Sequence, residues 1–123
     1  MEFSIKHNDD FFEIKVSGEA ELSKYGDFLD ALIGHDKWKP GTPVLVDEME
    51  LDTSPLTVGN VQQIADMCGQ RRAELGPAKC ALLAGRDLEF GMIRMWGVFV
   101  EGKWDIVSDL FTVREEAIGW LKE

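Results

Sequence analysis

The sequence predicts an α/β protein with a mixed five-stranded sheet and four helices, in the order β-β-α-β-α-β-α-β-α. Two observations lead to this fold class. Near the N-terminus, apolar and polar residues alternate on both sides of the turn residues Asn8-Asp9-Asp10, which is typical of an antiparallel hairpin. Farther along, short apolar runs alternate with stretches of helical periodicity. Such a pattern indicates parallel strands joined by crossover helices.

The first half of the chain contains three of the predicted strands and one helix. The hairpin strands cover Phe3–His7 and Phe12–Val16, and the second of them ends at Ser17-Gly18. Apolar residues then recur at helical spacing from Leu22 to Ile33. After a Pro- and Gly-containing loop, Val44-Leu45-Val46 is a short apolar run that ends at Asp47, and we expect it to be a strand buried on both faces.

The second half continues the same alternation. An acidic loop over 48–55 leads to Thr57, a favourable N-cap for the next helix. The predicted elements are, in order, a helix over 58–75, a strand over 80–84, a helix over 87–101, an extended segment over 104–111 and a helix over 113–121.

Length and charge restrict the function. The chain has 123 residues, with 13 Lys and Arg against 23 Asp and Glu, for a formal net charge of −10. We therefore expect one domain over 1–123 that binds neither nucleic acid nor anionic membranes. The longest apolar stretch, Gly91 to Val100, contains Arg94 and is far shorter than the ~20 residues that span a bilayer. No secretory leader precedes Phe3, so a cytoplasmic location is expected.

The sequence gives no reason to expect a metal or other cofactor. Cys68 and Cys80 are twelve residues apart among apolar neighbours, so we predict two buried thiols. His7 and His35 are the only histidines, and they form no metal-ligand spacing with these cysteines.

Several segments, in this element order, resemble the STAS family, and within it the SpoIIAA-like proteins of bacteria. The likeness is carried by the hairpin with Val16-Ser17-Gly18-Glu19, by Pro43–Asp47, by Ala81–Ala84, by the aromatic third helix and by the ending Glu116–Leu121. It spans essentially the whole chain. The resemblance implies a STAS-type fold and a non-catalytic regulatory role, exerted through contact with a protein partner.

In anti-sigma-factor antagonists of that family, a Ser or Thr in an Asp-Ser-Ser-Gly motif before the second helix is phosphorylated. The corresponding stretch is Asp52-Thr53-Ser54-Pro55, so the resemblance makes Ser54 and Thr53 phosphoacceptor candidates. Pro55 stands where the motif has Gly, and Glu48 and Asp52 would repel an added dianion. The alternative is that these residues only form a turn at the start of a helix.

The predicted third helix is apolar around nearly its whole circumference, whereas a helix packed on a sheet needs only one apolar stripe. Three explanations remain open. The third and fourth helices bury each other with Trp104 and Trp120 between them, or residues 88–100 form a homodimer interface, or they hold a small apolar ligand. The candidate contact residues are Phe90, Met92, Met95, Trp96 and Phe99.

No motif pairs a nucleophile with a base, so no catalytic residue is assigned. Arg86 follows the fourth strand, where α/β sheets often bind ligands, and it could hold an anion. We therefore expect a regulatory, protein-binding domain that is a candidate phosphoswitch. The alternative is a carrier or sensor of a small apolar or anionic molecule, held between the third helix and Arg86. An enzyme is the third choice.

Overall fold

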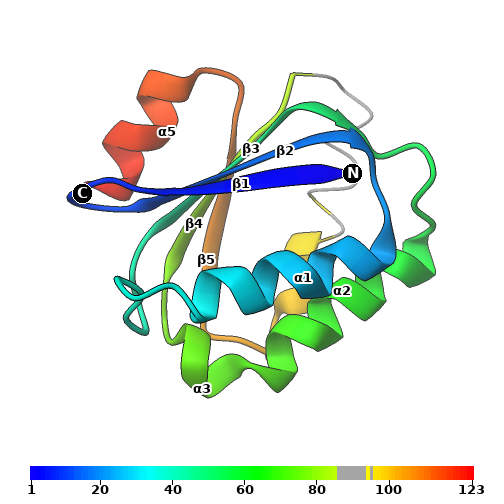
Figure 1. Ribbon diagram of the computed structural model, residues 1–123, viewed down its shortest axis with the longest axis horizontal. Coiled ribbons are helices and arrows are strands. Elements are labelled where there is room, and N and C mark those ends of the chain that lie inside the picture. The colour runs from blue at the N-terminus through cyan, green and yellow to red at the C-terminus, as the bar shows by residue number, and fades with distance from the viewer. Residues whose placement is uncertain (86–93, 95) are drawn as a thin grey trace.

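The computed structural model describes residues 1–85, 94 and 96–123. Its strands are β1 (Glu2–His7), β2 (Phe12–Glu19), β3 (Val44–Asp52), β4 (Lys79–Leu83) and β5 (Val107–Phe111). Its helices are α1 (Leu22–Ile33), α2 (Val58–Gln70), α3 (Arg72–Leu75) and α5 (Arg114–Leu121), and residues 96–100 are helical as well. The strands form one sheet in the order β1-β2-β3-β4-β5 (Figure 1).

The sheet is mixed, as predicted. β1 pairs antiparallel with β2, whereas β2, β3, β4 and β5 are parallel neighbours. The hairpin register places Ile5 opposite Ile14 and Phe3 opposite Val16. The turn is fixed by the Asn8 N–H, which donates to the Phe11 carbonyl at 2.9 Å. The predicted α/β class with an N-terminal antiparallel hairpin is therefore confirmed.

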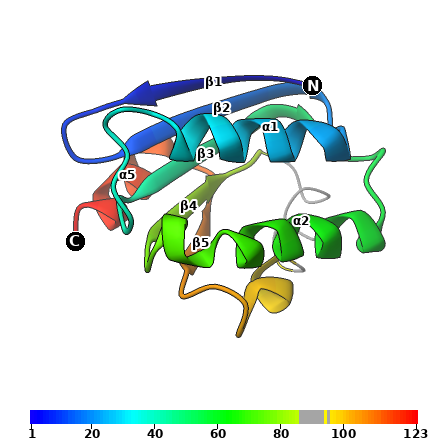
Figure 2. The same ribbon diagram turned by 60° about the horizontal axis from the view of Figure 1, so that its bottom comes forward.

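Helices cover both faces of the sheet, which explains why the central strands are apolar throughout. α1 and α2 lie on one face and α5 on the other (Figure 2). Alternate residues of β3 point to opposite faces: Val44 and Val46 join the cluster under α1 and α2, and Leu45 joins the cluster under α5.

The predicted second helix is in fact two helices. Arg71 has φ −104° and ψ 20°, which ends α2 and begins the four-residue α3. This adds one helix to the predicted four. The extended segment predicted over 104–111 is also shorter, because β5 begins only at Val107.

One explanation for the apolar third helix is wrong. Trp104 packs against the cluster under α1 and α2, and Trp120 packs against the cluster under α5. The sheet separates these two clusters, so the two tryptophans do not fill a common gap between the third and fourth helices. The last helix instead covers its own face of the sheet.

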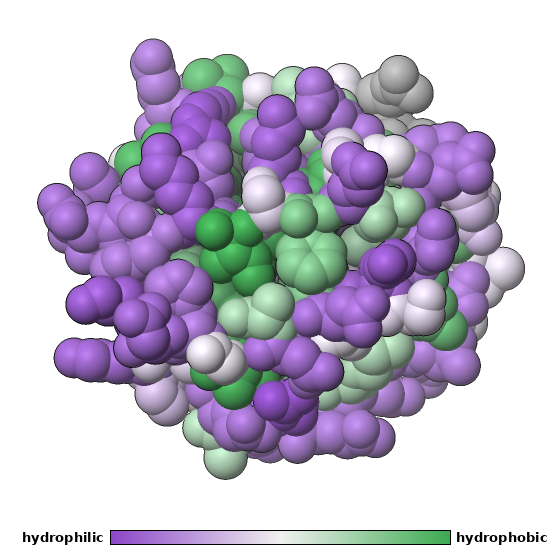
Figure 3. Space-filling view, in the orientation of Figure 1, coloured by the Kyte–Doolittle hydropathy of each residue, from purple (hydrophilic) through white to green (hydrophobic). Residues whose placement is uncertain are grey.

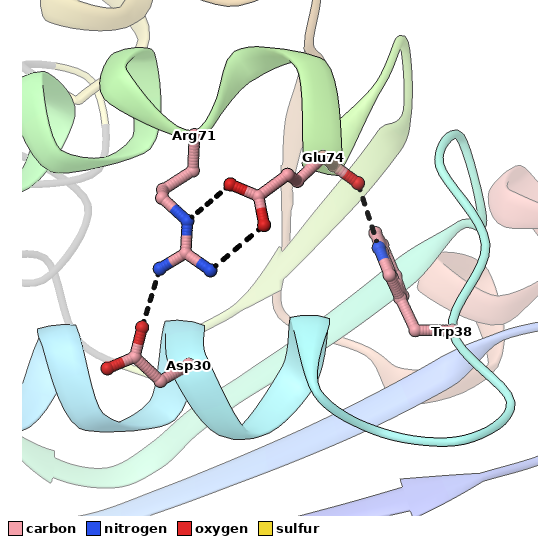
Figure 4. Close-up of polar contacts among 4 residues, drawn as sticks. All are labelled: Asp30, Trp38, Arg71 and Glu74. Carbon is pink, nitrogen blue, oxygen red and sulfur yellow. Dashed lines mark hydrogen bonds and ion pairs between the residues drawn. The ribbon is translucent and has the colours of Figure 1, made fainter.

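Polar contacts join α1 to the junction of α2 and α3 (Figure 4). The Arg71 guanidinium donates to Asp30 of α1 at 2.5 Å and, through two nitrogens, to Glu74 of α3 at 2.7 and 3.2 Å. Near them, the Trp38 indole N–H donates to the Glu74 carbonyl at 2.9 Å. These contacts hold α1 and the α2–α3 junction together at one end of their shared layer.

The surface seen from this side is mostly hydrophilic, but hydrophobic side chains gather in its middle, where Figure 1 draws β1 and α1 (Figure 3). β1 and α1 contribute several apolar side chains that are only partly buried, among them Phe3, Ile5 and Phe28. The first hairpin strand is therefore covered less completely than the central strands.

Gly76 is required by the backbone after α3. Its φ of 69° and ψ of 179° lie in a region open almost only to glycine, and a Cβ there would approach the Gly41 nitrogen to 2.7 Å.

We predict that Gly76→Ala lowers the free energy of unfolding by about 2–4 kcal/mol, measured by urea denaturation. Gly119→Ala is the control, because a Cβ at that exposed helical site meets nothing and should add about 0.5–1 kcal/mol. Equal effects at both sites would contradict this account.

Candidate functional site

A cavity of about 110 Å³ lies between the sheet and the layer of α1 and α2. Its walls come from β2, β3 and β4, from α1, α2 and α3, and from three tryptophans, Trp38, Trp96 and Trp104. Almost all of the lining side chains are apolar. A concave apolar site with a few polar groups is the usual form of a small-molecule site.

A β-bulge in β3 shapes the polar part of this wall. Between the pairs Lys15–Asp47 and Ser17–Glu50, β2 advances by two residues and β3 by three. The extra residue in β3 reverses which residues face the helices. Before the bulge, Val46 faces the α1–α2 layer, and after it Leu51 and Thr53 do.

Two buried polar atoms of cavity-lining residues lack a hydrogen-bond partner within the described part of the chain. They are the Thr53 hydroxyl oxygen and the Trp96 indole nitrogen. Thr53 is only 4% exposed. A buried polar group without a partner costs roughly 1–3 kcal/mol, so these two atoms lower the stability of the folded protein.

The other two cavity tryptophans are satisfied. The Trp38 indole N–H bonds to the Glu74 carbonyl, and the Trp104 indole N–H donates to the Gly76 carbonyl at 2.7 Å. Both acceptors belong to the chain around α3. Trp96 differs from these two, because its indole nitrogen has no acceptor within the described part of the chain.

One carboxylate belongs to the described part of the cavity wall. Glu48 of β3 lines the cavity and raises the pKa of two other lining groups, Tyr25 and Cys80, in addition to the larger rise that burial causes in each. Burial also raises the pKa of Cys68 to about 12. The phenol and both thiols are therefore neutral at pH 7. Both cysteines are buried and free, as predicted.

The predicted phosphoacceptors face different surroundings. They lie in a turn in which the Ser54 N–H donates to the Asp52 carboxylate at 2.9 Å and the Leu56 N–H donates to the Thr53 carbonyl. Ser54 is exposed, whereas the Thr53 side chain is buried. In this conformation Ser54 is the hydroxyl that a kinase can reach.

Of the candidates on the predicted third helix, the described residues include Trp96 and Phe99. Trp96 packs against the main core cluster and lines the cavity, and Phe99 is half-buried. Phe90, Met92, Met95 and Arg86 lie outside the described residues. Of the pair that is described, Trp96 belongs to the cavity wall.

Sequence reasoning missed Glu48 and Tyr25 as cavity residues and gave Thr53 no role in a wall. The sequence predicts a loop for the acidic stretch after Asp47, whereas β3 continues to Asp52. The available signal was Leu51, an apolar residue within that acidic stretch. It is 3% exposed and marks the strand beyond the bulge.

Neither a metal site nor a membrane span emerges from the residues that the structure describes. None of their His, Cys, Asp and Glu side chains form a group of three that could hold a metal ion. None of the helices formed by these residues is long and apolar enough to cross a membrane.

The architecture is that of the SpoIIAA-like fold. The chain is similar to the crystal structure of an uncharacterised protein of the DUF3478 family, with a SpoIIAA-like fold, from Shewanella loihica PV-4. The TM-score is 0.64 at 16% sequence identity, and the match covers 98% of this chain and 92% of that one. No protein-family model and no curated protein sequence matches the chain. The fold predicted from the resemblance is therefore confirmed.

The unpartnered hydroxyl predicts an unusual substitution effect. Thr53→Val keeps the side-chain shape and removes the hydroxyl, so we expect it to raise the free energy of unfolding of the ligand-free protein by about 1 kcal/mol. Thr57→Val is the matched control. The Thr57 hydroxyl accepts from the Asn60 N–H at 3.0 Å and caps α2, so its loss should cost about 1 kcal/mol. Urea denaturation measures both, and destabilisation by Thr53→Val would show that its hydroxyl is satisfied.

Proposed function

We propose that this protein is a non-catalytic carrier or sensor that binds a small, mainly apolar molecule in the cavity between the sheet and α1–α2. The observation that carries the proposal is the cavity itself, which lies among almost entirely apolar lining side chains that include three tryptophans. A concave apolar space of this kind is the usual form of a small-molecule site, and the empty space lowers the packing energy of the free protein.

The size of the cavity sets the size of the molecule. An engineered apolar cavity of roughly 150 Å³ holds benzene, so about 110 Å³ suits a molecule of about four or five non-hydrogen atoms. Small ligands gain at most ~1.5 kcal/mol per non-hydrogen atom, which limits the affinity to about micromolar. A reversible sensor or carrier operates well in that range.

The position of Trp96 favours this function over the protein contact expected from the sequence. An interface residue would present its ring to solvent in the free protein. Trp96 instead packs against the main core cluster and lines the cavity. Most of its apolar surface is therefore packed inside the molecule and is not available to a protein partner. Of the explanations for the apolar third helix, the described part of the helix supports a bound ligand.

Filling the cavity tests the proposal. We predict that Cys68→Leu on α2 abolishes the saturable change in Trp fluorescence caused by an apolar probe such as cyclopentane. The same change should raise the free energy of unfolding by about 1 kcal/mol, because it fills empty space. Val58→Leu is the control, since Val58 lies on the same helix and is 53% exposed, and it should change neither quantity.

A second, smaller substitution controls for strain from overfilling by Leu. Cys68→Val adds less volume and should weaken probe binding while keeping the stability. Undiminished binding in both folded variants would contradict the assignment of the site to this cavity.

A second candidate function, a phospho-regulated contact with a protein partner, is favoured by a separate observation. Ser54 is exposed in a hydrogen-bonded turn three residues before Thr57, the N-cap of α2. A phosphate there would add negative charge to a surface turn that already carries Asp52, which would repel an acidic partner and release it. This function agrees with the SpoIIAA-like fold and does not compete with a ligand in the cavity.

We predict that protein isolated from its own host carries one phosphoryl group in intact-mass spectra, and that Ser54→Ala removes it. Thr53→Val should leave the modification in place, because the Thr53 hydroxyl is enclosed. Modification that survives Ser54→Ala, or that is lost only in Thr53→Val, would contradict the assignment to Ser54.

A further inference from the structure

We propose that the free edge of β1 pairs with the same edge of a second copy of this chain, so that two five-stranded sheets join across a two-fold axis. β1 lies at one edge of the sheet, and no strand of the described residues pairs with its outer side. Such an edge presents backbone N–H and C=O groups that can bind another strand. This contact is independent of a ligand in the cavity and of residues 88–100.

The hairpin register determines which backbone groups of β1 point outward. In an antiparallel pair of strands, hydrogen-bonded and non-hydrogen-bonded residue pairs alternate. The Asn8 N–H donates to the Phe11 carbonyl, so this pair is hydrogen-bonded, and the register continues without a shift to the start of β1. By alternation, the backbone groups of Phe3, Ile5 and His7 point away from β2 and toward the free edge.

One antiparallel register matches the backbone groups and the side chains together. With Ser4 directly opposite Ser4 of the second copy, Phe3 faces Ile5 of that copy, and their outward backbone groups bond to each other. The same register places Glu2 opposite Lys6 of the second copy, on the other face of the sheet. A shift by two residues toward either end would separate Glu2 from Lys6.

The charges of β1 are complementary in this arrangement. Glu2 and Lys6 are exposed, and neither forms an ion pair with another described residue of its own chain. Opposite charges that face each other across two strands stabilise the pairing, and like charges destabilise it. The net charge of −10 on each copy opposes association. At physiological salt, however, the Debye length is about 8 Å, so side chains about 5 Å apart interact while more distant charges are largely screened.

The apolar face of β1 supports the same contact. Phe3 and Ile5 are only partly buried beneath α1, and the rings of Phe3 and Phe28 of α1 meet edge to face with centroids 6.0 Å apart. Hydrophobic side chains gather on the surface where Figure 1 draws β1 and α1 (Figure 3). Pairing of two β1 strands continues this apolar face across the two-fold axis and removes part of it from water.

The other edge strand offers no such match. The charged residue of β5 is Asp109, and the strand contains neither Lys nor Arg. An antiparallel pair of β5 strands centred on Asp109 would place two carboxylates opposite each other. β5 therefore serves as the control edge.

Charge reversal tests the contact. We expect the wild-type protein to show a concentration-dependent monomer–dimer equilibrium in sedimentation experiments at about 0.15 M salt. Lys6→Glu places two carboxylates opposite each other at two symmetric positions, so it should weaken association by roughly tenfold or more. Combining it with Glu2→Lys exchanges the two charges and should restore association. Lys39→Glu, in an exposed loop, makes the same change in net charge and should have little effect.

A disulfide between copies tests the register. Ser4→Cys should form an intermolecular disulfide with oxidised glutathione, because residues opposite each other in a non-hydrogen-bonded pair have Cα atoms about 4.5 Å apart. Cys68 and Cys80 are buried, so the wild-type protein should not crosslink. Asp109→Cys exposes a thiol on β5 and should crosslink much more slowly than Ser4→Cys.

The outcomes distinguish the surface from its register. Wild-type protein that stays monomeric at concentrations up to about 1 mM overturns the proposal. A dimer that Lys6→Glu weakens no more than Lys39→Glu does overturns the assignment to β1. If circular dichroism shows a folded double variant that still fails to associate, or if Ser4→Cys crosslinks no faster than Asp109→Cys, the register is wrong.

Discussion

The way in which α1 and α2 are held over one face of the sheet determines the rest of the structure. α5 covers the other face with a compact cluster that includes Leu45 and Ala81, both fully buried. On the α1–α2 face, the Arg71 ion pairs and the bonds of two indoles fix the helices at one end. Exposed ion pairs add little stability, so these contacts act mainly by fixing position, and the packed side chains carry most of the energy. The cavity is the space that this arrangement leaves open.

The bulge in β3 is the second constraint. Val44 and Val46 lie under the helices, and without the extra residue the even-numbered residues that follow them would lie there too. Thr53 would then face away from the cavity. The bulge thus turns Leu51 toward the main core and places Thr53 among the residues that line the cavity. A local irregularity of the backbone, and not a sequence motif, brings polar chemistry to an apolar site.

Most of the fold could be predicted from the sequence because it depends on periodicity. The hairpin around Asn8-Asp9-Asp10 and the buried runs at Val44 and Cys80 have patterns that only a few structures satisfy. The end of β3 could not be predicted, since a bulge interrupts the alternation on which the prediction depends. The cavity could not be predicted either. Its walls combine residues far apart in sequence, such as Tyr25 and Trp104. Periodicity shows which face of a helix or strand is apolar, but it does not show where the side chains of two packed elements leave a space between them.

The cavity and the exposed turn are parts of one segment. Thr53 and Ser54 are consecutive, and the turn that contains them is held by the Asp52 carboxylate and by the bond from Leu56 to the Thr53 carbonyl. A ligand in the cavity, which Thr53 helps to line, would therefore contact the same turn in which Ser54 faces solvent. Any preference of that ligand for one conformation of the turn would change how Ser54 is presented, and by linkage a partner bound at Ser54 would change the affinity of the cavity. The two candidate functions thus describe two surfaces of a single hydrogen-bonded turn, one facing inward and one facing outward.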